Sequence, residues 1–319
     1  MTNRTASTAA VASSAPEAAR WQDYFQLLKP RVMSLVVFTA VTGLVCAPAP
    51  AGRSPLNPGL AAVALLCIAV GAGAAGAFNM WYEADIDALM RRTRHRPLPL
   101  GRVQPSDALA LSVLLGLFST MLLGLAANWL AAALLAFTIA FYALVYTVWL
   151  KRRTAQNIVI GGLAGALPPL VGWTAASGSL ALAPLILVAI IFLWTPPHFW
   201  ALSLVTREDY ARAGVPMLPV VSGEAATRRR ILAYALVMAP TGLAPAFMGL
   251  GGWPYLVIAA AAGAGFVALA ARLAGASSAE IAAKRAKGLF AFSIAYLFLL
   301  FAALLIEHLA GVAPLTAPR

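Results

Sequence analysis

Nine long apolar segments, separated by short polar or basic stretches, constrain this chain more than any other feature of its sequence. They lie near residues 32–49, 58–80, 107–126, 129–150, 156–176, 181–203, 231–250, 253–271 and 288–310. A helix needs roughly 20 apolar residues to cross the hydrocarbon core of a bilayer, which is about 30 Å thick. With 61% hydrophobic and 11% charged residues, the composition excludes a soluble globular protein. The segments therefore predict a polytopic membrane protein.

The continuous Ala, Leu and Val runs predict helices, because a membrane barrel requires short segments of alternating polarity. We expect an all-α fold in which residues 29–311 form a single domain of nine transmembrane helices. We expect residues 1–28 to form a disordered cytoplasmic tail and residues 312–319 to form a short tail on the other side of the membrane. Cys46 and Cys67 fall in or beside apolar segments without metal-ligand spacing, which predicts buried thiols.

The basic residues predict the orientation of the chain in the membrane. Of the 23 lysines and arginines, all except Arg53 and Arg319 precede the first segment or follow the second, fourth, sixth and eighth. Such residues stay on the cytoplasmic side, so the N-terminus is expected inside and the C-terminus outside. The net charge of +12 then follows from topology, and nucleic acid is not an expected partner.

Acidic residues at the cytoplasmic end of the second segment point to chemistry. Asn79, Glu83 and Asp87 drift by only about 80° and rise by about 12 Å along a helix, so they share one face. Asp85 points to another side. An amide and two carboxylates on one face offer oxygen ligands to Mg²⁺, which binds through one or two carboxylates together with substrate phosphates. Carboxylates at a membrane edge are costly unless something binds them.

Arginines follow these acids and favour a diphosphate as the bound group. Arg91, Arg92 and Arg96 can form paired hydrogen bonds with phosphate oxygens. A solvated loop after a helix would explain these arginines equally well, but it would not explain the acids. A second basic cluster, Lys151, Arg152 and Arg153, follows the fourth segment and is a further candidate for phosphate or carboxylate binding.

The sixth segment ends in a second polar stretch, which begins at Pro196 and Pro197. Two prolines are expected to break or kink the helix and to create a pocket near His198. His198 has two open interpretations, a structural hydrogen bond or a contact with an acceptor substrate. The other candidates for the acceptor pocket are Tyr146, Trp200, Arg207 and Asp209; the two aromatic rings are candidates to stabilise an allylic cation, or are ordinary membrane-interface aromatics.

Together these motifs resemble those of the UbiA superfamily of intramembrane prenyltransferases. The resemblance spans roughly residues 25–305 and includes Lys29-Pro30-Arg31, the segment from Asn79 to Asp87, Arg91 to Pro99, Leu150 to Thr154, Gly165 to Gly172, His198 to Leu202, and Asp209 to Pro219. It is strongest with members that farnesylate haem. This chain departs from members with aromatic acceptors, which carry more aspartates in both motifs, and that puts metal binding by the second motif in doubt.

The resemblance implies nine helices around a central cavity and Mg²⁺-dependent ionisation of farnesyl diphosphate. The farnesyl carbon would join a vinyl group of protohaem IX, and water would supply a hydroxyl group. It implies Asn79, Glu83 and Asp87 as catalytic and metal-binding residues in a bacterial inner membrane. It leaves open whether the product passes to a downstream haem-modifying enzyme.

Two other functions remain open on the sequence alone. A prenyltransferase for a quinone precursor or another aromatic acceptor would share the first motif. A transporter would also contain kinked helices, but its ionisable groups would lie near the middle of the membrane, whereas here they crowd one face.

Overall fold

The computed structural model describes residues 19–49 and 56–316, and all regular elements within them are helical. They are α1 (Trp21–Leu27), α2 (Pro30–Cys46), α3 (Pro58–Tyr82), α4 (Ala84–Leu89), α5 (Pro105–Ala126), α6 (Trp129–Ala140), the π-helix η1 (Phe141–Leu150), α7 (Asn157–Ala166), α8 (Pro168–Ser177), α9 (Leu182–Val205), α10 (Arg207–Arg212), α11 (Leu218–Val221), α12 (Gly223–Thr241), α13 (Ala244–Phe247), α14 (Trp253–Ala274) and α15 (Ala279–Leu309).

Eight spans in the described residues are long and apolar enough to cross a membrane, some formed by two consecutive elements. A ninth results if α1 and α2, which meet at 51°, are counted as one. The predicted all-helical, polytopic fold is confirmed. The span positions agree with the expected segments to within several residues, except that α12 begins at Gly223 and α15 at Ala279, each about two turns before the expected start.

The polar residues between spans start the helices. Asn57 accepts a hydrogen bond from the backbone N–H of Gly59 at 2.8 Å, and Asn128 accepts one from Ala131 at 2.9 Å. Ser278 does the same for α15, with a 3.2 Å bond from the backbone N–H of Ile281. Each satisfies an N–H that has no partner within its own helix. Capping thus explains why α3 and α6 begin where the apolar segments do, and why α15 begins at Ala279, before its apolar segment.

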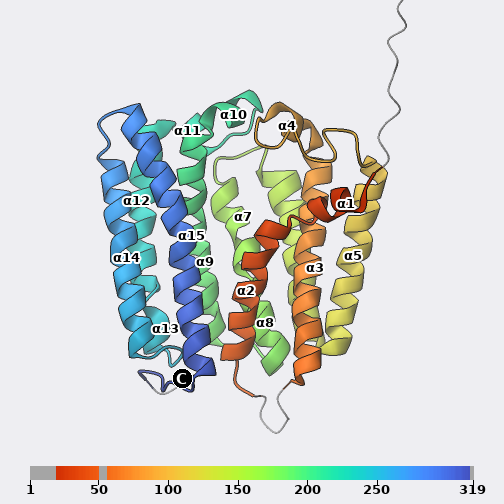
Figure 1. Ribbon diagram of the computed structural model, residues 1–319, viewed down its shortest axis with the longest axis vertical. Helices are drawn as coiled ribbons and strands as arrows, with labels where there is room; N and C mark the ends of the chain where they lie inside the picture. The colour runs from red at the N-terminus through yellow and green to blue at the C-terminus, as the bar shows by residue number, and fades with distance from the viewer. Residues whose placement is uncertain (1–18, 50–55, 317–319) are drawn as a thin grey trace, which may run out of the picture.

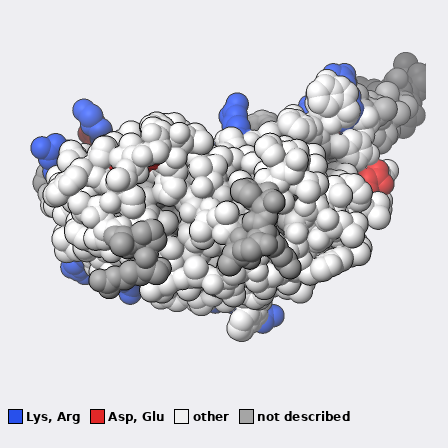
Figure 2. Space-filling view, turned by 90° about the horizontal axis from the view of Figure 1, so that it is seen from below, with Lys and Arg blue, Asp and Glu red and all other residues white. Residues whose placement is uncertain are grey.

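Figure 1 shows an upright bundle in which α4, α10 and α11 lie at one end and the C-terminus at the other. The basic loops 90–104 and 151–156 adjoin the first of these ends, which we call the cytoplasmic end after the orientation expected from the sequence. Figure 2 views the molecule from the opposite end, where the described surface is almost entirely uncharged and lysines and arginines appear only at its edges. The distribution of charge therefore fits the orientation expected from the sequence.

Two apolar cores fill the bundle. The larger joins α9, α12, α14 and α15 and contains Trp200, Tyr255, Phe266 and Tyr296. The smaller joins α2, α3, α5, α6 and α8. Within it α2 and α8 touch backbone to backbone, because a Cβ on Gly43 would lie 2.0 Å from the carbonyl oxygen of Pro169. Cys46 and Cys67 are buried and free, as predicted.

Two features differ from the expectations. Residues 21–27, assigned from the sequence to a disordered tail, form α1, which buries Leu27 against Ala77 and Met80. Residues 1–18 of that tail and 317–319 of the C-terminal tail lie outside the described residues. Of the two outcomes expected for Pro196 and Pro197, a break or a kink in the sixth span, the break does not occur, since α9 continues through both. Membrane helices tolerate proline where neighbouring groups compensate the lost hydrogen bonds.

Candidate active site

The first acidic motif lies where α3 ends and α4 begins. Glu83 is the joint between the two helices, yet the backbone bonds continue through it: Glu83 N–H donates to Asn79 at 3.0 Å and Asp87 N–H to Glu83 at 2.8 Å. Asn79, Glu83 and Asp87 thus keep one helical turn between them, and all three are buried, at 2%, 1% and 3% exposure. Asp85 lies on another side, with a side chain that is 64% exposed.

Each of these three buried side chains contacts a cation from a different part of the chain. The ammonium Nζ of Lys29, at the start of α2, donates to Oδ1 of Asn79 at 2.6 Å. Lys151, just after η1, donates to Oε2 of Glu83. Arg96, in the loop after α4, donates to Oδ2 of Asp87 at 2.6 Å. We call these six residues the polar cluster: Asn79, Glu83, Asp87, Lys29, Arg96 and Lys151.

The neighbouring charges of the polar cluster keep Lys151 charged. Burial alone would lower the pKa of Lys151, but the adjacent Glu83 carboxylate outweighs it, and the pKa of Lys151 is raised above its usual value. The second carboxylate oxygen of Glu83, Oε1, is buried and has no hydrogen-bond partner among the described residues. A buried acceptor without a partner is unfavourable by about 1–3 kcal/mol, so this oxygen fits a ligand that the protein itself does not supply.

A divalent cation suits that oxygen. Within residues 19–49 and 56–316 there is no group of three or more His, Cys, Asp or Glu side chains arranged to hold a metal. Mg²⁺ does not need such a cage, because it retains waters and takes one or two carboxylates together with phosphate oxygens. Glu83 and Asp87, with the Asn79 amide, could therefore hold Mg²⁺ only jointly with a phosphate ligand, which the surrounding cations would also bind.

A wall of tyrosines closes one side of the polar cluster. The rings of Tyr142 and Tyr146 on η1 lie 5.1 Å apart, and the Lys151 ammonium lies 5.8 Å from the Tyr146 ring. Five residues of an α-helix would turn Lys151 about 140° away from Tyr146. In the π-helix the N–H of Lys151 instead bonds the carbonyl of Tyr146 at 3.0 Å, which places the two on one face.

The remaining cations of the first motif and of the 151–153 cluster surround this site at the cytoplasmic end. Arg152 donates to both oxygens of Asp85 at 2.9 and 2.7 Å and to the Tyr82 carbonyl at 3.0 Å, which joins α4 to the end of η1. These bonds lower the pKa of the Asp85 carboxyl group. Arg91, Arg92 and Arg153 are exposed, and no ion pair involves them within the described part of the chain.

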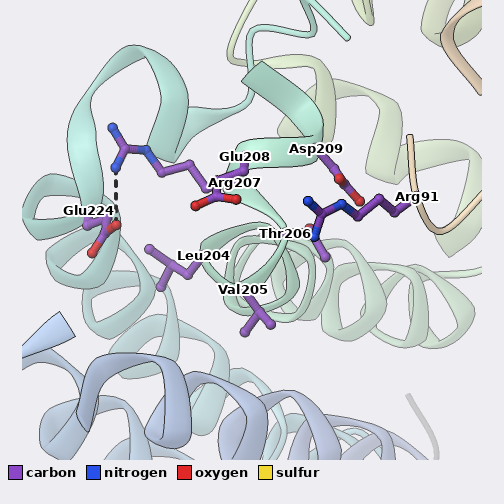
Figure 3. Close-up of a pocket in the computed structure, with 8 residues that line it drawn as sticks. All are labelled: Arg91, Leu204, Val205, Thr206, Arg207, Glu208, Asp209 and Glu224. Carbon is purple, nitrogen blue, oxygen red and sulfur yellow. Dashed lines mark hydrogen bonds and ion pairs between the residues drawn. The ribbon is translucent and has the colours of Figure 1, made fainter. Parts of the chain in front are cut away.

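The second polar stretch forms a separate cavity of about 330 Å³ beside α10. Figure 3 shows Arg91, from the first motif, reaching toward Thr206 and Asp209 at this cavity. Arg207 crosses it to pair with Glu224 at 3.2 Å, and Asp209 pairs with Arg212 at 2.5 Å. The structure thus brings Arg91, Arg207 and Asp209 together, as residues that line one cytoplasmic cavity.

His198 does not line this cavity. Its ring is stacked between Trp194 and Phe290, at centroid distances of 4.2 and 4.6 Å, and its Nδ1 shares a 2.6 Å hydrogen bond with the Ser293 hydroxyl. The His198 ring thus packs between α9 and α15, whereas the cavity described above lies at the end of α9. Trp200 is also displaced from its expected place, since it packs edge-on against Tyr234 in the larger core.

Three residues of the site were absent from the sequence-based candidates. Lys29 belongs to the Lys29-Pro30-Arg31 motif of the family resemblance, but its sequence context indicated no role in the site. Tyr142 and Thr147 lie on η1, and Thr147 accepts a 3.1 Å bond from the Asn79 amide. No sequence signal distinguishes a π-helix from an α-helix in this apolar stretch, so the inward face of η1 could not be assigned.

Comparisons with known proteins agree with this geometry. The sequence matches the UbiA prenyltransferase family over residues 36–295. A protoheme IX farnesyltransferase from Caulobacter sp. strain K31 is 60% identical, and the match covers 94% of this chain and 93% of that protein. One from Methylorubrum extorquens is 57% identical over 91% and 90% of the two chains.

Solved structures share the fold at low sequence identity. A digeranylgeranylglyceryl phosphate synthase superposes with a TM-score of 0.71 at 17% identity, covering 90% of this chain and 99% of the other. A UbiA homologue from Archaeoglobus fulgidus bound to DMAPP and Mg²⁺ gives 0.66 at 17% identity, covering 88% and 99%. The sequence match, the relatives and the shared fold all indicate the same conclusion: this chain belongs to the UbiA prenyltransferase family.

Proposed function

We propose that this protein transfers the farnesyl group of farnesyl diphosphate to a vinyl group of protohaem IX, with addition of water, to give haem O and diphosphate. The polar cluster carries the donor half of this proposal, because it combines buried oxygen ligands with three cations at the membrane edge. The relatives named protoheme IX farnesyltransferase, up to 60% identical, support the acceptor half.

The polar cluster suits the first step, in which the bond between farnesyl C1 and the diphosphate oxygen breaks. Mg²⁺ held by Asn79, Glu83 and Asp87 would neutralise charge on the leaving diphosphate. Lys29, Arg96 and Lys151, with the exposed Arg91, Arg92, Arg152 and Arg153 nearby, supply hydrogen bonds that strengthen as negative charge develops on it. The faces of Tyr142 and Tyr146 stabilise the allylic cation left behind.

The second step joins the carbons. The vinyl π electrons of protohaem IX attack C1 of the farnesyl cation, and the new cation beside the porphyrin ring is captured by water, which loses a proton. Water must be excluded until the carbon bond forms, and the apolar spans around the site provide that exclusion. Arg91 and Arg207 at the cytoplasmic cavity are suited to the propionate edge of the acceptor, with Asp209 fixing Arg212 beside them.

The site lies at the end of the bundle that carries the basic loops. We infer that this end faces the cytoplasm of a bacterial cell, with the protein in the inner membrane and its C-terminus in the periplasm. Both substrates then reach the enzyme from the side on which its cations lie. His198 and Trp200 act in this proposal by supporting α9, which positions the cavity, whereas Tyr146 faces the reacting carbon.

Mass spectrometry of haem extracted after incubation with protohaem IX, farnesyl diphosphate and Mg²⁺ tests the proposal. Wild-type protein should give a species heavier by one farnesyl group and one water, and a Glu83→Ala/Asp87→Ala variant should not. Glu280→Ala is a matched control, because Glu280 is exposed at the start of α15. Folded, active protein that prenylates 4-hydroxybenzoate but not haem would refute the proposed acceptor and retain the donor site.

A further inference from the structure

The short helix α1 has an apolar outer face with no protein partner among the described residues. Trp21 is 72% exposed and Phe25 51%, and their rings lie 6.4 Å apart one turn from each other. In Figure 1, α1 crosses in front of α3 close to the end that carries α4. Val32, near the start of α2, is also exposed, at 56%. The helices α1 and α2 together are long and apolar enough to count as one candidate span bent by 51°, so the exposed face of α1 lies at the end of a membrane span.

The inner face of α1 is attached to the bundle. Asp23 lies 3.5 Å from Arg102, the Tyr24 hydroxyl donates to Asp107 at 3.1 Å, and Leu27 is fully buried. One face of the helix is therefore fixed by protein and the other is apolar and open. This is the pattern of a helix that lies in the plane of a membrane interface, where tryptophan is especially favoured.

The corner after α1 holds Lys29 in a strained conformation. Lys29 has φ 52° and ψ 58°, the left-handed region, and no other non-glycine residue of the described ranges has a positive φ. Its N–H bonds the Gln26 carbonyl at 3.1 Å, and its own carbonyl accepts from Val32 at 2.9 Å. Such strain persists only where the surroundings impose it, and it clusters at functional sites.

The side chain of Lys29 ends in the polar cluster. Besides its 2.6 Å bond to Asn79, the ammonium lies 6.0 Å from the Tyr142 ring and interacts electrostatically with Glu83 and Lys151. The aliphatic part of the side chain lies against Gly76 on α3, where an added Cβ would be 3.4 Å from Cδ of Lys29, an ordinary van der Waals contact. A single corner thus joins the exposed aromatic face of α1 to the proposed diphosphate site.

We propose that α1 lies in the headgroup region of the cytoplasmic leaflet, and that its seating there holds Lys29 in the diphosphate site. Lys29 then orients the Asn79 amide and places its own ammonium where the prenyl diphosphate binds, and α1 is the element that positions it. The role of Lys29 rests on the proposed donor chemistry, whereas the placement of α1 does not. Lipid is the occupant of the outer face because α1 and α2 together are apolar enough to form one bent membrane span, which places this face where the span meets the membrane surface.

The depth of α1 can be measured without any assay of activity. A nitroxide is attached at position 21 through an introduced cysteine, in a Cys46→Ala/Cys67→Ala background, in bilayers of phosphatidylethanolamine and phosphatidylglycerol. We expect relaxation by oxygen to exceed relaxation by a water-soluble nickel chelate, as at position 117 on the lipid-facing side of α5. Dominant relaxation by nickel, as at the exposed Glu208, would overturn the interfacial placement.

Binding of farnesyl thiolodiphosphate, a non-reacting donor analogue, tests the role of Lys29. Lys29→Met should weaken binding roughly tenfold or more, as expected for loss of a charge-assisted contact, and Lys29→Arg should weaken it less. Lys29→Gly relieves the left-handed backbone but removes the ammonium, and it should bind as weakly as Lys29→Met. Binding by Lys29→Gly at the wild-type level would show that only the turn matters and would refute the role of the ammonium.

The coupling between α1 and Lys29 is tested by Trp21→Ser/Phe25→Ser. This variant should weaken analogue binding in bilayers, and adding it to Lys29→Met should cause little further loss, because both changes affect one interaction. Leu114→Ser/Phe118→Ser on α5 is a matched control, since it removes two exposed apolar side chains at the same spacing from a different helix. Equal effects in the control, or full additivity with Lys29→Met, would contradict the coupling.

Discussion

Lys151 donates a hydrogen bond to Glu83 across 68 positions of the chain, and this ion pair joins the end of η1 to the joint between α3 and α4. The Glu83 side chain is 1% exposed and that of Lys151 17%. Lys151 therefore neutralises the buried carboxylate of Glu83, and Glu83 holds the ammonium of Lys151 beside Tyr146.

Replacing Lys151 with Met should abolish activity and destabilise the protein. It leaves the buried carboxylate of Glu83 without a partner, a change that typically costs 3–5 kcal/mol. Thermal unfolding in detergent and the haem assay check both effects. A Glu83→Gln/Lys151→Met double variant should regain much of the stability and none of the activity, and Arg153→Met should resemble wild type in stability. Unchanged stability of Lys151→Met would contradict the pairing.

A methyl group on Gly161 should disturb the tyrosine wall. The added Cβ would lie 2.1 Å from Cδ2 of Tyr146, so the ring must move. We expect Gly161→Ala to lower kcat/KM at least about tenfold, since small misplacements at a reacting centre have effects of this size. Gly165→Ala, one turn further along α7, meets nothing within 4 Å and serves as the control. Equal activity of the two variants would remove Tyr146 from the site.

The pair between Asp85 and Arg152 should contribute to stability in a pH-dependent way. Because Arg152 lowers the pKa of Asp85 from its ordinary 3.8, the contribution is complete above that value and is lost as the pH falls through the folded-state pKa. The Asp85 side chain is 64% exposed, so the effect should be about 1 kcal/mol or less. Unfolding of wild type and Arg152→Met, compared between pH 3 and 7, should show a difference that shrinks toward the acid end.

Substitutions of His198 separate its two roles. His198→Phe keeps an aromatic ring between Trp194 and Phe290 but loses the hydrogen bond to Ser293, whereas His198→Ala loses both. If the residue is structural, as its packing indicates, His198→Phe should retain haem affinity and most of the stability, and His198→Ala should lose about 2–4 kcal/mol. Spectroscopic titration with haem measures the affinity. Equal loss of affinity in both variants would instead assign the imidazole to haem binding.

Much of the fold was predictable because lipid leaves few alternatives. The length of the apolar segments indicates where spans lie, and the distribution of arginines indicates which end carries the charge. The shared face of Asn79, Glu83 and Asp87 was also predictable, since it depends only on helical spacing. These properties are local to one helix.

The contacts between distant helices were not predictable in the same way. The pairing of Asp87 with Arg96 could be anticipated from their proximity in sequence, but those of Lys29 and Lys151 depend on how α2 and η1 pack on α3. The direction of His198 and Trp200 required knowledge of which faces of α9 meet α12 and α15. Helical spacing alone shows which residues share a face of one helix, whereas the packing of the helices determines which neighbours that face contacts.

The π-helical hydrogen bonding of η1 also limits how this enzyme can change over evolutionary time. Winding η1 as an α-helix without changing its ten residues in number would turn Lys151 about 140° away from Tyr146, whereas deleting one residue between the two would leave them only about 40° apart. Winding without a deletion would move the ammonium away from Glu83 even though no side chain of the polar cluster had been altered. A substitution that favours α-helical winding here should therefore be tolerated best together with the loss of one residue between Tyr146 and Lys151.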